Sequence, residues 1–190
     1  MRVISGEFKG RRLLLKKGRD VRPTSSRVRT AIFNILPRDL SGVMALDLYA
    51  GTGALGIEAL SRGATAVVFV DSGRDALKCL RDNLEALNRA DQFRLLHKKA
   101  GPALKLLAAE NARFDLALID PPYRSGEAPK VMNQLSRLPL LNPGAVAVIE
   151  HDPAERLLDE YGGLVRYDQR KYGATGLSFY EWREEGGEDE

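Results

Sequence analysis

From residue 43 onward, short apolar runs alternate with segments in which apolar residues recur every three or four positions. The runs have the length of strands, and the segments between them have the spacing of one face of a helix. The runs cover 43–48, 66–71, 93–97, 114–119 and 145–150, and the helical segments cover 54–62, 73–88, 102–109 and 130–138. Strands that are apolar along their whole length and alternate with helices are typical of a parallel sheet covered on both faces, so this region predicts an α/β fold.

Both ends of the chain depart from this alternation. The last two apolar runs, 164–171 and 177–183, are too close together for a helix between them and predict a closing antiparallel hairpin. Near the N-terminus, 2–5 and 12–15 flank a turn region with two glycines and predict a small hairpin. A helix is expected to begin at a cap within 24–26 and to end before Pro37, with two of its arginines, Arg27 and Arg29, on its outer side.

Charge divides the 190 residues into three parts. Residues 1–40 carry eleven Lys or Arg against three acids, a net charge of +8, whereas 184–190 carry five acids and no base. A basic segment on a neutral body is typical of an arm that contacts nucleic-acid phosphates, although a solvated basic surface has the same composition. We expect a basic extension at 1–40, a main domain at 41–183 and a disordered acidic tail at 184–190.

Several classes of protein do not fit the composition. The chain has one cysteine, Cys79, and two histidines that are far apart, which predicts neither an internal disulfide nor a metal site. No stretch approaches the ~18 apolar residues of a membrane span, and the N-terminus has no apolar signal core. We therefore expect a soluble, cytoplasmic protein without a metal or a membrane contact.

A glycine-rich loop follows the first predicted strand. Gly51, Gly53 and Gly56 fit the spacing G-x-G-x-x-G, which lets the backbone turn tightly and approach a ligand at a helix N-terminus. Asp71, at the end of the second strand, is placed to bind a ribose diol. Taken alone, this pattern suits either NAD or S-adenosylmethionine.

Asp47 favours S-adenosylmethionine over NAD. It lies at the mouth of the first strand, where the pyrophosphate of a dinucleotide would pass. A carboxylate there repels phosphate but attracts the sulfonium or ammonium group of S-adenosylmethionine. In the alternative interpretation Asp47 braces the loop and Asp71 caps the next helix.

The fourth strand runs directly into Asp120-Pro121-Pro122-Tyr123. In an open α/β sheet, ligands bind beyond the carboxyl ends of the strands where the strand order reverses, so this tetrapeptide is expected beside the glycine loop. The prolines remove two N–H donors and Asp120 adds a carboxylate, which leaves a corner of hydrogen-bond acceptors. Such a corner can hold the exocyclic amine of a base with its lone pair toward a methyl donor, while Tyr123 stacks on the ring. The alternative is a simple turn that ends a strand.

Together these motifs resemble those of the amino-methyltransferases, which include adenine-N6 DNA methyltransferases and several RNA enzymes. More narrowly, the chain resembles the bacterial 16S ribosomal RNA guanine-N2 methyltransferase family. The matching stretches are 2–6, 10–13, 22–24, 27–29, 33–36, 50–63, 120–123, and Tyr172-Gly173 followed by Tyr180. The Arg22-Pro23-Thr24 segment separates this family from other amino-methyltransferases.

The resemblance implies a Rossmann-like, seven-stranded methyltransferase sheet, mostly parallel with its last strand antiparallel, and a small N-terminal hairpin and helix. It also implies S-adenosylmethionine as donor and one guanine of 16S rRNA within the small ribosomal subunit as substrate, and we expect a monomer. The catalytic candidates are Asp120, Pro121, Pro122 and Tyr123. The cofactor-binding candidates are Asp47, Tyr49, Ala50, Gly51, Thr52, Gly53, Asp71, Ser72, Lys99 and Ala100. The RNA-binding candidates are Arg11, Arg12, Arg22, Thr24, Arg27 and Arg29.

Two positions depart from the family pattern: Thr30 replaces the family's acid after Arg29, and the other lies after the third strand. Relatives commonly have Asp or Asn before an alanine after the third strand, where it binds the adenine amine of the cofactor. Here Lys99 precedes Ala100, and a lysine cannot accept that hydrogen bond. Adenine recognition is left to the Ala100 backbone or to another side chain.

Other functions remain open on the motifs alone. Guanine-N2 and adenine-N6 both present a ring-conjugated amine, so the acceptor corner does not distinguish them. A DNA adenine-N6 methyltransferase usually needs a target-recognition domain for which this chain has no room. A non-catalytic RNA-binding or assembly factor on the same fold would not need an intact Asp120, and an NAD oxidoreductase lacks a proton donor near the fourth strand.

Overall fold

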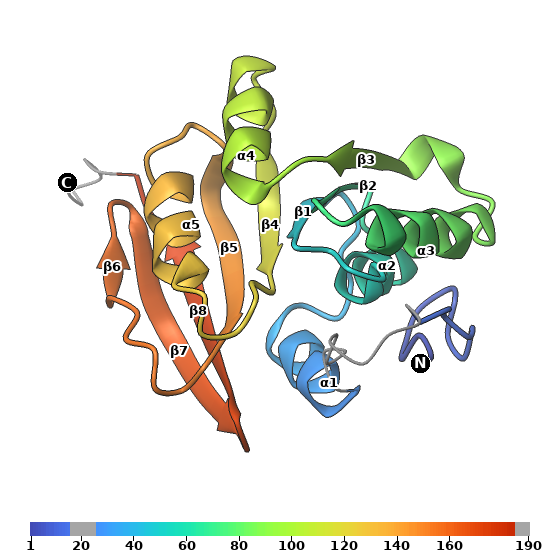
Figure 1. Cartoon of the computed structure of the whole chain (residues 1–190), viewed down its shortest axis with the longest axis horizontal. Helices are drawn as coiled ribbons and strands as arrows, with labels where there is room; N and C mark the ends of the chain where they lie inside the picture. The colour runs from blue at the N-terminus through green and yellow to red at the C-terminus, as the bar shows by residue number, and fades with distance from the viewer. Residues whose placement is uncertain (16–25, 185–190) are drawn as a thin grey trace.

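The computed structural model describes residues 1–15 and 26–184, and within them it contains one eight-stranded sheet covered by helices (Figure 1). The helices are α1 (Ser26–Ile35), α2 (Ala54–Ser61), α3 (Arg74–Glu85), α4 (Ala100–Ala109) and α5 (Glu127–Leu135), with a short 3₁₀ turn at Ala90–Gln92. The strands are β1 (Met44–Leu48), β2 (Ala66–Asp71), β3 (Phe93–His97), β4 (Phe114–Ile119), β5 (Leu141–His151), β6 (Glu160–Tyr161), β7 (Leu164–Tyr172) and β8 (Thr175–Trp182).

The sheet has the order β3-β2-β1-β4-β5-β8-β7-β6. Strands β1 to β5 are parallel, and β8 runs antiparallel to both β5 and β7. The predicted α/β sheet with an antiparallel last strand is therefore confirmed. The two-residue strand β6, which pairs with β7 at the edge, adds an eighth strand that the sequence did not predict.

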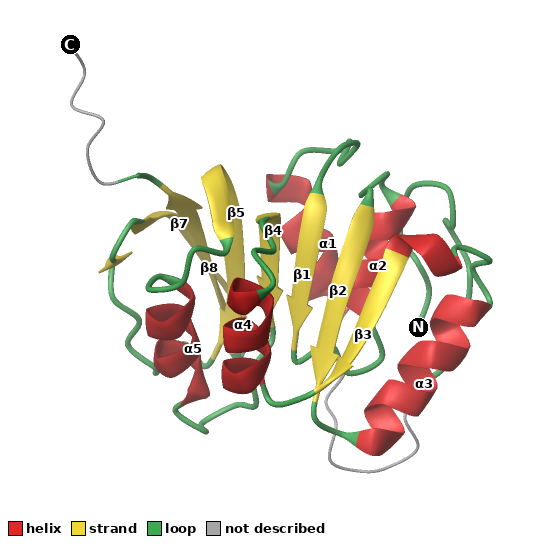
Figure 2. Cartoon of the chain, turned by 90° about the horizontal axis from the view of Figure 1, so that it is seen from above, coloured by secondary structure: helices red, strands yellow, loops and turns green. Residues whose placement is uncertain are grey.

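Two hydrophobic cores lie on opposite faces of the sheet. Helices α1, α2 and α3 pack on one face, and α4 and α5 pack on the other; Figure 2 shows α4 and α5 in front of the strands and α1 and α2 behind them. The strands β1, β2 and β4 are buried along most of their length because helices cover both of their faces. This arrangement leaves the carboxyl ends of the parallel strands as the edge at which a ligand can bind.

The strand order reverses between β1 and β4. Leu48 at the end of β1 pairs with Ile119 at the end of β4 and with Val70 near the end of β2. The Asp120 backbone N–H also donates to the Leu48 carbonyl, at 3.3 Å. The glycine loop and the Asp120–Tyr123 tetrapeptide therefore leave the sheet side by side, as the sequence predicted.

The predicted N-terminal hairpin is wrong in its extent. Within residues 1–15 the structure contains one antiparallel bridge, between Arg2 and Arg12. The Ile4 and Ser5 N–H groups donate instead to the Glu58 carboxylate of α2, at 2.8 and 3.0 Å, and the Leu14 N–H donates to the Asn83 side chain of α3, at 2.7 Å. Side chains of two helices thus satisfy backbone groups that a longer hairpin ladder would have used.

The N-terminal segment 1–15 packs on the α1–α3 face (Figure 1), where Val3, Phe8 and Leu13 belong to the core. The Asn83 amide joins this segment to the glycine loop, because it donates both to the Leu14 carbonyl at 3.2 Å and to the Thr52 carbonyl at 3.0 Å. Of the expected tail at 184–190, the structure describes only Glu184. Within residues 1–15 and 26–184, no helix is long and apolar enough to cross a membrane.

Candidate active site

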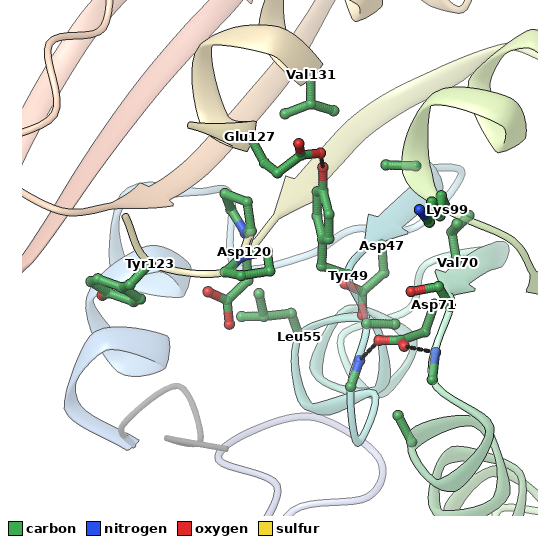
Figure 3. A pocket seen from close by; sticks show the side chains of 18 of the residues that line it. Asp47, Tyr49, Leu55, Val70, Asp71, Lys99, Asp120, Tyr123, Glu127 and Val131 are labelled. Atoms are coloured by element: carbon green, nitrogen blue, oxygen red, sulfur yellow. Dashed lines mark hydrogen bonds between the residues drawn. The ribbon is translucent and has the colours of Figure 1, made fainter. Parts of the chain in front are cut away.

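A cavity of about 1480 Å³ opens at the carboxyl ends of the parallel strands. The predicted catalytic residues all line it, as do all the predicted cofactor-binding residues except Gly53. Its volume exceeds the ~300–1,000 Å³ of typical small-molecule pockets, so it has room for two ligands side by side. Figure 3 shows Asp47, Asp71 and Asp120 around this space, with Tyr123 on one side and Lys99 on the other.

Asp71 holds two loops of the cavity wall in place. Its carboxylate accepts the Gly51 N–H at 2.8 Å and the Gly73 N–H at 2.7 Å, drawn as dashed lines in Figure 3. It therefore braces the glycine loop and the start of α3, and its half-buried carboxylate still faces the cavity. Each carboxylate oxygen can accept more than one hydrogen bond, so a ribose diol fits the same group.

Asp47 is buried behind the glycine loop and accepts the Gly56 N–H at 2.9 Å. Burial raises the pKa of Asp47 to about 8, and the nearby carboxylates of Asp120 and Asp71 raise it as well, while the Gly56 hydrogen bond lowers it. Loop bracing, one of the two interpretations open from the sequence, is therefore part of what Asp47 does.

The charged residues that line the cavity indicate whether it suits S-adenosylmethionine or a dinucleotide. Three carboxyl groups, those of Asp47, Asp71 and Asp120, line it, and a bound cation would favour the ionised form of the buried Asp47. Such a lining repels a pyrophosphate and stabilises a cation, which is the charge of a sulfonium group. The residues present therefore fit S-adenosylmethionine better than a dinucleotide.

Gly56 serves packing rather than ligand approach. A Cβ at this position would lie 2.3 Å from Cε1 of Phe69 and 2.9 Å from Oδ2 of Asp47. The third glycine of the motif thus lets α2 sit close to β2, whereas Gly51, with a φ of 56°, forms the turn itself.

Tyr123 is anchored at the far side of the acceptor corner. Its hydroxyl donates to Glu150 Oε1 of β5 at 2.5 Å and is 2.9 Å from the Thr175 hydroxyl of β8. Burial raises the pKa of Tyr123, so the phenol stays protonated and can donate. The two hydrogen bonds fix the direction of the ring at the cavity wall.

Tyr49 and Lys99 occupy the cofactor side of the cavity. The Tyr49 hydroxyl donates to Glu127 Oε2 of α5 at 3.3 Å. This hydrogen bond joins the loop between β1 and α2 to a helix on the other face of the sheet from α2. Lys99 is exposed and precedes α4, and Ala100 is buried at the first position of that helix. No side-chain acceptor stands at Lys99, so the backbone at Ala100 stays the candidate for adenine recognition.

The prediction that Arg29 lies on the outer side of α1 is wrong. Its side chain is 1% exposed, it donates to the Arg2 carbonyl, and its Nε lies 4.0 Å from Glu58 Oε2. Arg29 belongs to the apolar stripe of α1, one turn before Phe33, and it fastens the N-terminal segment. Arg11, Arg12 and Arg27 are exposed, whereas Arg22 and Thr24 lie outside the described residues.

The sequence did not indicate several residues that line or support the cavity. Glu127 accepts a hydrogen bond from Tyr49, and Glu150 accepts one from Tyr123. Arg124 and Asp152 form an ion pair of 2.8 Å on the cavity wall. Only Arg124, next to Tyr123, has a position that could have drawn attention to it. Within the described residues, no group of three or more His, Cys, Asp or Glu side chains could hold a metal ion.

Comparison with known proteins places the chain. The family model described as "Conserved hypothetical protein 95" matches residues 1–181. The "Putative rRNA methyltransferase YlbH" of Bacillus subtilis is 36% identical over 183 residues, covering 96% of this chain and 100% of its own. The "Ribosomal RNA small subunit methyltransferase D" of Escherichia coli is 32% identical over 152 residues, covering 80% of this chain and 75% of its own.

A solved structure agrees with these relatives. The "Putative methyltransferase yhhF from Escherichia coli" superimposes with a TM-score of 0.84 at 29% identity, covering 96% of this chain and 98% of that chain. The similarity extends over the N-terminal segment as well as the sheet, and this is the family expected from the sequence motifs. The chain therefore belongs to the family of the ribosomal RNA small subunit methyltransferase D proteins.

Proposed function

We propose that the protein transfers a methyl group from S-adenosylmethionine to the exocyclic N2 amine of a specific guanine in 16S rRNA of the small ribosomal subunit. The observation that carries this proposal is the shared cavity, in which the acceptor corner Asp120–Tyr123 adjoins a glycine loop backed by carboxylates. The names of the relatives, which describe rRNA methyltransferases, support an RNA substrate.

The residues of the corner act by holding the amine. The nitrogen lone pair of a base amine is delocalised into the ring, which makes the nitrogen a poor nucleophile. When the Asp120 carboxylate and the Pro121 carbonyl each accept one N–H, the lone pair is directed away from the ring plane. When bound, S-adenosylmethionine supplies the electrophilic methyl group. As the N–C bond forms and the methyl–sulfur bond breaks, nitrogen would gain positive charge, and Asp120 would stabilise that charge until the amine proton passes to solvent.

The basic N-terminal extension is proposed to bind RNA phosphates. Arg11, Arg12 and Arg27 are exposed in the structure, and exposed arginines suit phosphate oxygens. Arg22 and Thr24 stay in the proposal through the family motif, whereas Arg29 is removed from it because it is buried. The target guanine would leave its stack to reach the corner, as enzymes that act on bases require.

Transfer of labelled methyl groups tests the function. The protein is incubated with tritiated S-adenosylmethionine and, separately, with small ribosomal subunits from cells that lack it, free 16S rRNA, or duplex DNA. We expect label in N2-methylguanosine of the RNA after digestion to nucleosides. Label confined to adenine of DNA, or cofactor binding without any transfer, would contradict the proposal, and the second result would favour a non-catalytic assembly factor.

The pKa of Asp47 predicts a pH-dependent preference for the charged cofactor. S-adenosylmethionine and S-adenosylhomocysteine differ in the sulfonium charge, so the ratio of their affinities, compared with the same ratio in Asp47→Asn, isolates the effect of Asp47 on that charge. Below a pH of about 8 the Asp47 carboxyl is protonated in the empty site, because burial raises its pKa, and a proton there competes with the sulfonium. We expect the affinity ratio to increase by about tenfold or more between pH 6 and pH 9, measured by calorimetry.

Asp47→Asn is the matched control for this pH dependence. The amide oxygen can still accept the Gly56 N–H, so the loop keeps its brace while the titration is removed. A ratio that is flat with pH in the natural protein, or equally steep in Asp47→Asn, would rule out this role of Asp47.

A further inference from the structure

The cavity continues past the acceptor corner, along β5, β8 and β7 and away from the predicted cofactor-binding residues on β1 and β2. This side of the cavity is formed by the loops that follow β4 and β5 and by the turn between β7 and β8. Its lining residues are Arg124, Asp152, Pro153, Ala154, Lys171 and Ala174. If a base amine occupies the Asp120–Tyr123 corner, the ring of the base lies on this side, because the predicted cofactor-binding residues line the other side of the corner.

Asp152 is held rigidly on this wall. Its Oδ1 accepts the Ala154 N–H at 2.9 Å, and its Oδ2 accepts the Arg124 Nε–H at 2.8 Å. The Arg124 and Ala154 hydrogen bonds lower the pKa of Asp152, so it is a carboxylate at neutral pH and offers only acceptors. The Asp152 side chain is 13% exposed, in contrast to the 85% of Arg124.

The ion pair joins the two loops that would flank a base. Ile119 of β4 pairs with Ile149 of β5, so the chain after each strand leaves the sheet at the same edge. Arg124 directly follows Tyr123, and Asp152 directly follows the end of β5. An acceptor and a donor thus lie beside the acceptor corner, in positions fixed by neighbouring strands.

We propose that Asp152 and Arg124 read the Watson–Crick edge of the target base and select guanine. The inference rests on the proposed function, because it assumes that a base amine enters the Asp120 corner. Next to its N2 amine, guanine presents the N1–H donor and then the O6 acceptor. The Asp152 carboxylate accepts N1–H, and the N–H groups of the Arg124 guanidinium other than Nε–H donate to O6.

Adenine fails the same reading. With its N6 amine in the corner, adenine presents the N1 lone pair to the Asp152 carboxylate, and the next position carries a C–H group that offers Arg124 no acceptor. Adenine N1 and the Asp152 carboxylate would then face each other as two acceptors with no proton between them. A polar site rejects a wrong substrate in this way, because its buried groups are left without hydrogen bonds. The selection therefore comes from this wall, whereas the corner itself accepts either amine.

Asp152→Asn tests this reading, with Glu110→Gln as its control. Glu110 forms an exposed pair with Arg94 and does not line the cavity. With small ribosomal subunits as substrate, we expect Asp152→Asn to lower kcat/KM by about tenfold to a hundredfold, the effect of losing a hydrogen bond to a charged group. S-adenosylhomocysteine affinity and thermal stability should stay unchanged in both variants, and Glu110→Gln should transfer as fast as the natural protein.

Competition by nucleotides adds a readout that a purely structural role of Asp152 would not change. Guanosine monophosphate carries N1–H and O6, whereas 2-aminopurine riboside monophosphate keeps the same amine but lacks both. We expect the first to inhibit the natural protein at a lower concentration than the second, and the difference to shrink to about twofold or less in Asp152→Asn. Equal inhibition of the natural protein by both nucleotides, or an unchanged kcat/KM in Asp152→Asn while guanine is methylated, would overturn the inference alone. Transfer to adenine by the natural protein would instead overturn the proposed function.

Discussion

Replacing Asp120 by alanine is expected to lower kcat for methyl transfer by about a hundredfold to a thousandfold, the usual cost of removing one group that stabilises charge developing in a transition state. The variant loses the carboxylate that positions the amine and meets the charge developing on nitrogen. Single-turnover transfer to small ribosomal subunits measures the effect. Affinity for S-adenosylhomocysteine should change by about twofold or less, because the Asp71 and Gly51 contacts of the cofactor side are untouched.

Asp120→Asn separates the positioning of the amine from the effects of the negative charge. The amide oxygen of asparagine still accepts an N–H but is a far weaker base than a carboxylate. Because the amide oxygen keeps the hydrogen bond that orients the amine but not the negative charge, we expect Asp120→Asn to have a kcat between those of Asp120→Ala and the natural protein. Equal loss in both variants would mean that the carboxylate acts through its charge or as a base and not through positioning, and full activity in Asp120→Ala would show that the corner is not the site of transfer.

The second large effect concerns stability. Glu58 is fully buried in α2 and accepts hydrogen bonds from the Ile4 and Ser5 N–H groups and from Arg62 Nε at 3.1 Å. Glu58→Gln turns one acceptor into a donor and leaves the buried Arg29 without its carboxylate. We expect the free energy of unfolding, measured in urea, to fall by about 3–5 kcal/mol, the usual cost of breaking a buried charge pair from one side.

Glu7→Gln is a control from the same N-terminal segment. Glu7 forms an exposed ion pair with Arg89, and solvent screens such pairs. Its urea midpoint should match that of the natural protein, and the Ile4 and Ser5 amides should exchange with solvent faster only in Glu58→Gln. If the Glu58 and Glu7 variants were equally stable, the buried cluster would not be what holds the N-terminal segment.

The strands of the sheet could be predicted closely from the sequence. Three of them, Ala66–Asp71, Phe93–His97 and Phe114–Ile119, have the predicted bounds. Strands β2 and β4 lie between helices on both faces, so nearly every position of each strand is apolar. The first polar residue on either side therefore marks the end of the strand in the sequence. That β1 and β4 are neighbours was expected from the fold class, because the strand order of an open α/β sheet reverses there, and this placed the glycine loop and the tetrapeptide at one ligand edge.

Two helix starts were predicted too late for one physical reason. Helix α4 begins at Ala100 rather than at 102, and α5 begins at Glu127 rather than at 130. Each contains a proline in its first turn, Pro102 or Pro129, where the missing N–H would have had no partner in the helix. The predictions treated these prolines as boundaries, although they belong to the helices.

The contacts that complete the site could not be read from local pattern. Glu150 and Thr175 meet Tyr123 across 27 and 52 residues of chain, and Asp152 meets Arg124 across 28. Such partners are set by strand pairing, in particular by the antiparallel return of β8 beside β5. The role of Glu58 could have been predicted from the sequence. The helix around it is almost wholly apolar and is therefore expected to be buried, and a buried carboxylate needs hydrogen-bond partners.

The anchored hydroxyl of Tyr123 has a consequence for the entropy of substrate binding. An exposed aromatic ring at the mouth of a cavity would rotate among several orientations, and stacking a base on it would freeze that freedom at the moment of binding. Here Glu150 and Thr175 hold the ring from two strands. The loss of rotational freedom therefore occurs once, when the chain folds, and the arriving base meets a surface that is already ordered.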